Sequence, residues 1–298
     1  MTTVLIAGVA VIDFVFRIDE MPRRAEKYRA RDAEIVGGGG AANAAVAVAR
    51  LGGRALLATR LGDDAIADMI LADLARENVD TTLVRRFDGK RSSFSSVFID
   101  AKGERQIVNY RDMGMSFDAD WLTPMLPDRF DAALADTRWP QGGPAVLDAA
   151  KARGLPAIVD AEAPTREALA TIRAGTHVAF SRQGLRDYCG HGDIERGLRQ
   201  AAAETGAWVC VTDGEHGVTF LAKGETGHVP AYPVEVVDTL GAGDVWHGAF
   251  ALALGEGADE TEAIRLANAA AAIKCTRFGG RAGAPGRAEA ETFMRARS

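Results

Sequence analysis

Hydrophobic positions along the chain recur with two spacings, one typical of strands and one typical of helices. Residues 4–8, Val-Leu-Ile-Ala-Gly, form a short apolar run that predicts a buried central strand. Similar runs predict further strands at residues 55–61, 130–135, 156–160, 177–180 and 207–212. Helical spacing separates these runs, most clearly at residues 41–51, 65–76 and 258–274. This alternation predicts an α/β fold with a mostly parallel, helix-flanked sheet.

Two other segments alternate apolar and polar residues in the manner of half-exposed strands. Residues 11–36 place apolar residues such as Phe14 between charges, and residues 92–112 do the same around Val97, with a turn at 102–103. Alternation of this kind indicates strands with one solvated face. We therefore expect two hairpins that form a small antiparallel β lid above the α/β body. The chain of 298 residues shows no linker rich in Pro, Gly or Ser, so we expect a single domain over residues 1–298.

A tight turn of small residues, 238–244, separates an extended apolar run at 234–237 from a helix that begins near residue 245. The first turn of a helix presents unpaired N–H groups and the positive end of its dipole. Small residues let an anion approach those groups. A carboxylate at this place, Asp244, suits a general base that deprotonates a hydroxyl about to attack a phosphoryl group. The simpler interpretation is a helix cap.

The full string around this turn, Asp-Thr-Leu-Gly-Ala-Gly-Asp, resembles the second signature of the ribokinase-like (PfkB) carbohydrate kinases. The resemblance implies that Asp244 is the catalytic base and that Gly241, Ala242 and Gly243 form an anion hole. It also implies an ATP-dependent sugar kinase that uses Mg²⁺, because phosphoryl transfer needs charge neutralised between the β- and γ-oxygens.

A run of four glycines at 37–40 precedes a predicted helix that ends Arg-Leu-Gly at 50–52. Its spacing is not that of a dinucleotide fingerprint, and the chain has no Walker A sequence. Taken alone, it could be a flexible loop. The run resembles the first signature of the same kinase family, which implies that Gly38, Gly39 and Asn43 contact sugar hydroxyls.

Asp13 follows the first predicted strand. A carboxylate at the carboxyl end of a strand can accept two hydroxyl hydrogen bonds from a sugar, at the edge where open α/β sheets bind ligands. The alternative is a solvated loop aspartate. The family has a sugar-binding aspartate at this place.

The segment Val-Thr-Asp-Gly-Glu-His-Gly at 211–217 matches the family's nucleotide-side loop, and the small residues at 267–272 resemble the helix that flanks the adenine. The nucleotide-binding residues that this resemblance implies are Thr212, Gly214, Gly217 and Asn268. The family's Asn-x-x-Glu is replaced here by Ser-Arg-Gln-Gly at 181–184. We therefore expect Mg²⁺ to be held mainly by nucleotide phosphates and water, with Asp160 or Glu162 as candidate protein ligands.

Three further residues suggest an anionic substrate: Lys27 and Asn109 in the two lid segments, and Arg138 after the strand at 130–135. Two cations and an amide would bind a three-oxygen anionic group well if they converged. Each could equally be a solvated surface residue.

Several segments of the chain are similar to the bacterial sulfofructose kinases within the same family. They are residues 26–28, 102–105, 134–139 and 274–283. The resemblance implies that Lys27, Asn109 and Arg138 hold a sulfonate. It also implies ATP-dependent phosphorylation of the C1 hydroxyl of 6-deoxy-6-sulfofructose. Asn43 departs from that subgroup, which has Thr there.

Composition narrows the class of partners. The formal net charge is −6, so nothing favours nucleic acid or an anionic membrane surface as a ligand. Three widely separated cysteines and no signal-like N-terminus lead us to expect a cytoplasmic protein with free thiols. We also expect a homodimer formed through the exposed lid. The alternatives are a kinase for another acidic or neutral sugar, a non-catalytic sugar sensor, and, less in keeping with the motifs, a nicotinamide-dependent oxidoreductase.

Overall fold

The computed structural model describes residues 1–102 and 104–297, so the predicted turn at 102–103 lies partly outside the described residues. Within these ranges the main sheet has nine strands in the order β13-β12-β11-β10-β9-β8-β1-β4-β5. The strands from β11 to β5 are parallel to their neighbours, while β12 and β13 run antiparallel. The bounds are β1 Thr3–Ala7, β4 Arg54–Gly62, β5 Asp80–Phe87, β8 Ala132–Asp136, β9 Ala157–Ala161, β10 His177–Ser181, β11 Trp208–Thr212, β12 Val218–Ala222 and β13 Glu225–Val229.

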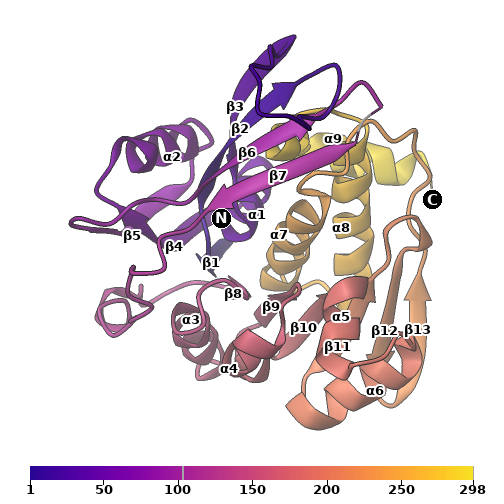
Figure 1. Cartoon of the computed structure of the whole chain (residues 1–298). Helices are drawn as coiled ribbons and strands as arrows, with labels where there is room; N and C mark the ends of the chain where they lie inside the picture. The colour runs from indigo at the N-terminus through magenta and orange to yellow at the C-terminus, as the bar shows by residue number, and fades with distance from the viewer. Residues whose placement is uncertain (103, 298) are drawn as a thin grey trace.

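Helices cover both faces of this sheet (Figure 1). One apolar core lies between the sheet and α1 Gly40–Arg50, α2 Ala65–Arg76, α7 Ala242–Gly255, α8 Glu260–Cys275 and α9 Arg287–Arg295. A second core lies under α3 Gly142–Lys151, α4 Leu169–Ala174, α5 Arg182–Cys189 and α6 Ile194–Thr205. Short 3₁₀ turns are η1 Thr123–Met125, η2 Arg166–Ala168, η3 Gly214–His216 and η4 Gly280–Gly283. The predicted mostly parallel, helix-flanked α/β fold is confirmed.

Helices α1 and α7 lie in close contact although about 200 residues separate them. Gly248 of α7 packs so tightly that a Cβ there would overlap the carbonyl of Ala44 in α1. This small-residue contact brings the first turns of the two helices together. These first turns belong to the two motifs identified in the sequence, the glycine run at 37–40 and the turn at 238–244.

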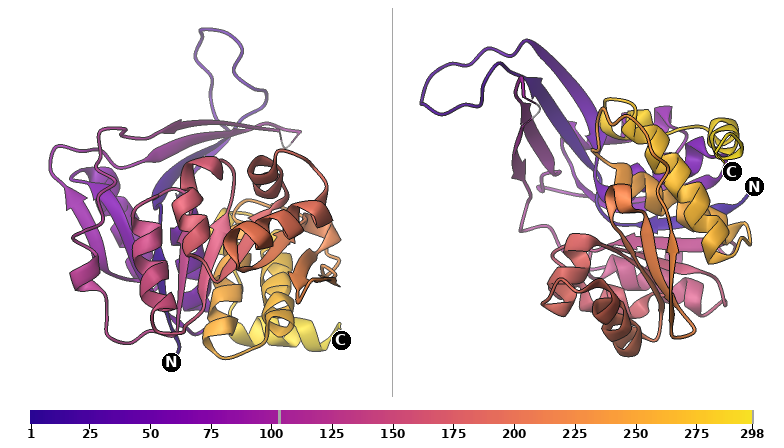
Figure 2. Two further views of the ribbon diagram at one scale, coloured as in Figure 1. Left: turned by 90° about the horizontal axis from the view of Figure 1, so that it is seen from below. Right: turned by 90° about the vertical axis from the view of Figure 1, so that its right-hand side faces the viewer.

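The lid is a four-stranded sheet in the order β3-β2-β6-β7. Its strands are β2 Val11–Arg17, β3 Asp32–Gly38, β6 Phe94–Ile99 and β7 Arg105–Tyr110. The β2–β3 and β6–β7 pairs are antiparallel hairpins, as predicted, and a parallel β2–β6 pairing joins them. The connection between β2 and β3, residues 18–31, projects far from the rest of the molecule (Figure 2).

The expected extended run at 234–237 is not a strand in the structure. The chain leaves the sheet after β13, and Val236 and Val237 are more than half exposed. The N–H of Val237 instead donates to the carbonyl of Cys275 at the end of α8, which ties this segment to the helix layer. Among the described residues, no helix has both the length and the apolar character required to cross a membrane.

Candidate active site

The turn before α7 has the conformation that an anion hole requires. Gly241 is the N-cap of α7 and has a φ of 73°, which favours glycine. The N–H of Ala242 donates to the carbonyl of Thr239 at 3.2 Å, whereas the N–H of Gly243 has no hydrogen-bond partner within the described residues. A Cβ at Gly243 would meet nothing within 4 Å. The turn therefore presents a bare amide and open space to a ligand.

Asp244 lies beside the glycine run at 37–40 and the first turn of α1. Its Oδ2 accepts a hydrogen bond of 2.6 Å from Nδ2 of Asn43 in α1. A Cβ at Gly40 would lie 3.5 Å from oxygens of both Asp244 and Asp136, so these carboxylates flank the same glycine. The two signature motifs thus meet at one point, with Asp244 half-buried between them.

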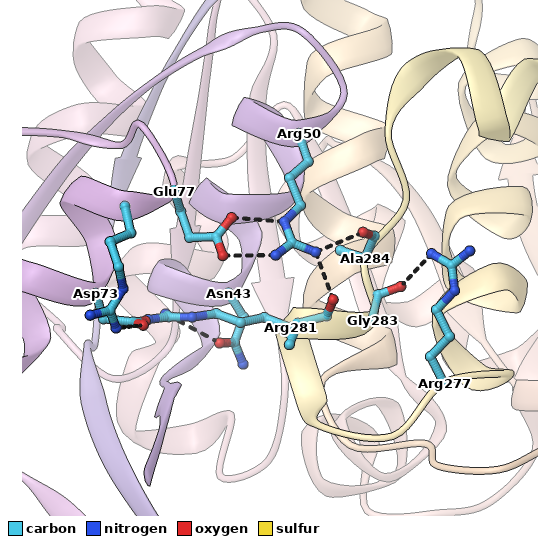
Figure 3. A network of polar contacts seen from close by, with 10 residues as sticks. Asn43, Arg50, Asp73, Glu77, Arg277, Arg281, Gly283 and Ala284 are labelled. Atoms are coloured by element: carbon cyan, nitrogen blue, oxygen red, sulfur yellow. Dashed lines mark hydrogen bonds and ion pairs between the residues drawn. The ribbon is translucent and has the colours of Figure 1, made fainter. Parts of the chain in front are cut away.

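A buried arginine supports Asn43 from behind (Figure 3). Arg281 is 3% exposed, forms an ion pair with Asp73, and directs Nη1 towards Oδ1 of Asn43 at 3.5 Å. Since the amide oxygen faces a cation, the amide nitrogen is directed at Asp244. The Asn43 side chain therefore orients the Asp244 carboxylate.

Asp238, at the start of the turn, is a buried carboxylate with several partners. Its carboxylate accepts a 2.9 Å hydrogen bond from the N–H of Leu240 and pairs with Lys274 at 3.2 Å and with Arg105 of the lid at 2.6 Å. Lys274 is fully buried and also donates to the Asp238 carbonyl at 2.7 Å. Burial on its own would raise the pKa of Asp238, but the Leu240 N–H and the Lys274 charge outweigh it and lower that pKa. The anion-hole turn is thereby fixed to both the lid and α8.

The glycines of the first motif allow close approach of backbone to Asp13. A Cβ on Gly38 would overlap the Asp13 carboxylate, and one on Gly39, whose φ is 93°, would overlap the Val9 carbonyl. Asp13 is the third residue of lid strand β2, not the end of a main-sheet strand as the sequence suggested, because the chain enters the lid directly after β1.

Burial raises the pKa of Asp13, and this effect exceeds the lowering by its hydrogen bond from Ser95 and by the charge of Arg281. Sequence reasoning overlooked a second carboxylate, Asp136, which is 5% exposed. It accepts N–H groups of Val9, Ala41 and Arg138 and so fixes three loops around the site. Burial raises its pKa too, against those hydrogen bonds.

Asn109 and Arg138 line one pocket of about 270 Å³ between the lid and the edge of the main sheet. Arg138 donates to the Ala163 carbonyl at 2.8 Å and lies 4.0 Å from Glu162. The same pocket is lined by Val9, Val11, Ser93, Phe94, Ser95, Tyr110 and Arg111.

Lys27 is not among the residues that line this pocket. It is exposed and lies in the projecting 18–31 connection. Of the three expected anion ligands, Asn109 and Arg138 therefore lie together within one chain, and Lys27 does not. The reason is that the 18–31 connection projects away from the rest of the molecule (Figure 2). Arg111, which sequence reasoning missed, supplies a second cation at the pocket.

The residues predicted to bind the nucleotide line a second pocket of about 560 Å³ beside the turn at 241–243. Thr212, Gly214, Gly217 and Asn268 all line it, together with Ala242, Gly243 and Trp246. Asn268 is already engaged, since it accepts from Nε1 of Trp246 at 2.8 Å and donates to the Pro230 carbonyl at 3.0 Å. Gly217 begins the β12–β13 hairpin at a φ of 84°, where a Cβ would overlap the Val229 carbonyl.

Asp160, at the end of β9, has a buried oxygen, Oδ1, without a hydrogen-bond partner within the described residues. Burial raises the pKa of Asp160 well above its ordinary value, and Asp244 and Glu162 add to the effect. An uncompensated carboxylate among others is the environment in which a divalent cation binds favourably. No cluster of three or more His, Cys, Asp or Glu side chains suited to a metal occurs within the described ranges.

A larger depression of about 860 Å³ lies around α5 and the loop after it, lined by residues such as Arg166, Arg186 and His191. It contains none of the residues that the two signature motifs supply. The 560 Å³ pocket, in contrast, is lined by Ala242 and Gly243 of the second motif, and the 270 Å³ pocket by Asn109 and Arg138.

Comparison with known proteins agrees with this geometry. The sequence model of the pfkB family carbohydrate kinases matches residues 1–287. Ribokinase of Bacillus subtilis (strain 168) is 29% identical over 298 residues, which cover 99% of this chain and 100% of that protein. A crystal structure of a candidate ribokinase from Agrobacterium tumefaciens has a TM-score of 0.91 at 38% identity, with 99% and 98% of the two chains covered. Arabidopsis thaliana ribokinase complexed with ribose and ATP shares the fold, with a TM-score of 0.86 at 24% identity and 99% of both chains covered.

The chain belongs to the pfkB family of carbohydrate kinases. It is accordingly an ATP-dependent sugar kinase, and its cofactors are ATP and Mg²⁺.

Proposed function

We propose that this kinase phosphorylates the C1 hydroxyl of 6-deoxy-6-sulfofructose. The observation that carries the proposal is the pocket in which Asn109 from the lid and Arg138 from the turn after β8 meet. Ser95 lines the same pocket and donates a hydrogen bond to Asp13, so the pocket adjoins the expected sugar site. With a neutral sugar, the Arg138 guanidinium would have only its 4.0 Å contact with the exposed Glu162 as a counter-charge at the far end of the substrate.

The sugar hydroxyls are assigned to the first motif and to the lid. Asp13 accepts two hydroxyl hydrogen bonds, and the backbone at Gly38 and Gly39 approaches the ring because neither residue carries a side chain. Asn43 joins them chiefly by orienting Asp244. The sulfonate lies against Asn109 and Arg138. These contacts direct C1 towards α7.

Asp244 is the proposed general base. It takes the proton of the C1 hydroxyl while the C1 oxygen bonds to the γ-phosphorus of ATP and the bond to the β–γ bridging oxygen breaks, which releases ADP. The N–H groups of Gly241, Ala242 and Gly243 face the transferring phosphoryl, with that of Gly243 already free of other partners. The nucleotide occupies the 560 Å³ pocket, against Thr212, Gly214, Gly217 and Asn268.

Mg²⁺ neutralises charge on the β- and γ-phosphate oxygens when it is bound with the nucleotide. The protein residues proposed to hold it, directly or through water, are Asp160 and Glu162. Asp160 is the stronger candidate because its buried Oδ1 accepts no hydrogen bond in the described part of the chain and has Nε2 of His247 as a neighbour at 3.5 Å.

Lys27 remains a proposed sulfonate ligand. It would reach the pocket if the 18–31 segment moved, or if a second copy of the chain supplied its own Lys27. The proposed homodimer through the lid is supported by exposed apolar side chains on β3 and β7, namely Ile35, Ile107 and Val108, each more than half exposed. A kinase of another acidic sugar is the alternative, since a phosphate or a carboxylate would suit the same pocket.

The test measures ADP release with 6-deoxy-6-sulfofructose, fructose 6-phosphate and fructose as acceptors. We expect the highest kcat/KM with the sulfonate and a product phosphorylated at C1 by ³¹P NMR. Arg138→Met should lower kcat/KM for the sulfonate on the order of tenfold to a hundredfold, because a charged hydrogen bond contributes about 1.5–3 kcal/mol. Arg129→Met, at an exposed position, is the matched control. Fructose turnover equal to or above that of the sulfonate would overturn the proposed substrate.

A further inference from the structure

The wall of the 270 Å³ pocket contains a cation that neither signature motif includes. Arg111 follows β7 directly, and its Nη2 donates to the Arg138 carbonyl at 2.5 Å, which places it next to the proposed anion ligand. It lies 5.6 Å from the ring of Phe117. It lines this pocket and also a smaller one of about 20 Å³ immediately beside it.

A third arginine, Arg60, lies close to Arg111 in the smaller pocket. Arg60, near the end of β4, also lines the smaller pocket, donates to the Ser116 carbonyl at 2.7 Å and stacks on Phe117 at 4.6 Å. Burial and the nearby charge of Arg111 lower the pKa of Arg60 to about 10, with Asp136 acting in the opposite direction.

The positive charge at this wall is only partly balanced within the protein: the buried carboxylate of Asp136 acts on Arg60 and Arg138, but close ion pairs are few. Arg60 and Arg111 donate to backbone carbonyls and form no ion pair within the described residues, and Arg138 has only a 4.0 Å contact with an exposed glutamate. The nearest acidic neighbour in the smaller pocket, Asp112, is occupied by the N–H groups of Arg91 and Gly114. Three arginines held close together repel one another, and an anion bound between them would lower the free energy of the folded protein.

We propose that Arg111 is a specificity-determining residue that binds the acidic head group of the sugar together with Asn109 and Arg138. This inference rests on the proposed function, namely that the substrate is an anionic sugar, and it holds for a sulfonate or a phosphate. Two guanidinium groups and an amide present enough donors for the three oxygens of either group. Arg60 is a positioning residue: it lines the smaller pocket together with Arg111 and adds positive electrostatic potential there.

The experiment compares Arg111→Met and Arg111→Lys with Arg85→Met. Arg85 is a matched control because it is also exposed and stacks on aromatic rings, those of Phe87 and Trp121, but lines neither pocket. For each variant, kcat and KM are measured separately with 6-deoxy-6-sulfofructose, fructose 6-phosphate and fructose. Thermal unfolding identifies any variant that fails to fold.

We expect Arg111→Met to raise KM for both acidic sugars by tenfold or more, to change kcat/KM for fructose less than threefold, and to be partly rescued in Arg111→Lys. The loss should be larger for the phosphate, which is largely a dianion, than for the monoanionic sulfonate. An equal loss on fructose, or no loss on either acidic sugar, would overturn the role of Arg111. If the wild-type enzyme prefers fructose 6-phosphate and the variant loses that preference, the sulfofructose proposal fails while this inference stands.

Discussion

Replacing Asp244 by Asn tests the proposed base while changing the fold little. The Asn side chain is isosteric, and its amide oxygen can still accept the 2.6 Å hydrogen bond from Asn43. Asp244 lies near the buried carboxylates of Asp136 and Asp160, so loss of its charge relieves repulsion. We therefore expect the free energy of unfolding to remain the same or to rise slightly.

Activity should fall by a much larger factor. A positioned general base contributes about 10²- to 10⁴-fold, which corresponds to roughly 2.7–5.4 kcal/mol in the activation free energy. The measurement is kcat from coupled ADP release at saturating ATP and sugar. ATP affinity, measured by calorimetry on the same protein, should stay within about threefold, because the nucleotide pocket is lined by Ala242 and Gly243 and not by Asp244.

Asp148→Asn is the matched control, since Asp148 is an exposed carboxylate on α3 and far from both pockets. It should leave kcat unchanged. If Asp244→Asn keeps more than about a tenth of wild-type kcat, which is a barrier change under 1.4 kcal/mol, Asp244 is not the base. A large loss of ATP affinity would mean that Asp244 acts in binding, and the reasoning from the geometry would be wrong.

Two glycines of α7 should respond oppositely to replacement by alanine. Gly248→Ala forces a methyl group against the Ala44 carbonyl and should reduce the free energy of unfolding by about 1–3 kcal/mol. Gly243→Ala places its methyl group in open space, so it should keep or slightly raise thermal stability but lower kcat by obstructing the phosphoryl group. Thermal unfolding and kinetics of both variants distinguish these outcomes, and equal destabilisation would contradict the packing argument. Asp238 has a lowered pKa in the folded state, so its carboxylate contributes stability that is present above its ordinary pKa of 3.8 and lost as the pH falls through the folded pKa. Asp238→Asn should cost on the order of 3 kcal/mol near pH 7 by leaving Lys274 unpaired, and should flatten the dependence of unfolding free energy on pH below the ordinary aspartate pKa; an unchanged slope in that range would refute the assignment.

Local pattern was sufficient for most of the fold. The helix predicted at 65–76 has those bounds in the structure, because its apolar face and its N-terminal aspartate are both encoded within a few residues. The strand order of the main sheet, the tight α1–α7 contact and the parallel β2–β6 pairing in the lid were not predictable, since they depend on contacts between distant segments.

The candidate site divides in the same way. The sequence alone indicated the class of chemistry through the full string at 238–244, which resembles a family signature, whereas small residues before a helix N-terminus and an adjacent carboxylate, Asp244, equally allow a helix cap. Only the tertiary structure decided that Asn43 is used to orient that carboxylate, that Lys27 lies outside the pocket, and that Arg111 lies inside it. Strand β1 lies between β4 and β8, so residues near the carboxyl ends of all three strands reach one edge of the sheet, although nothing in their sequence spacing records that they are neighbours.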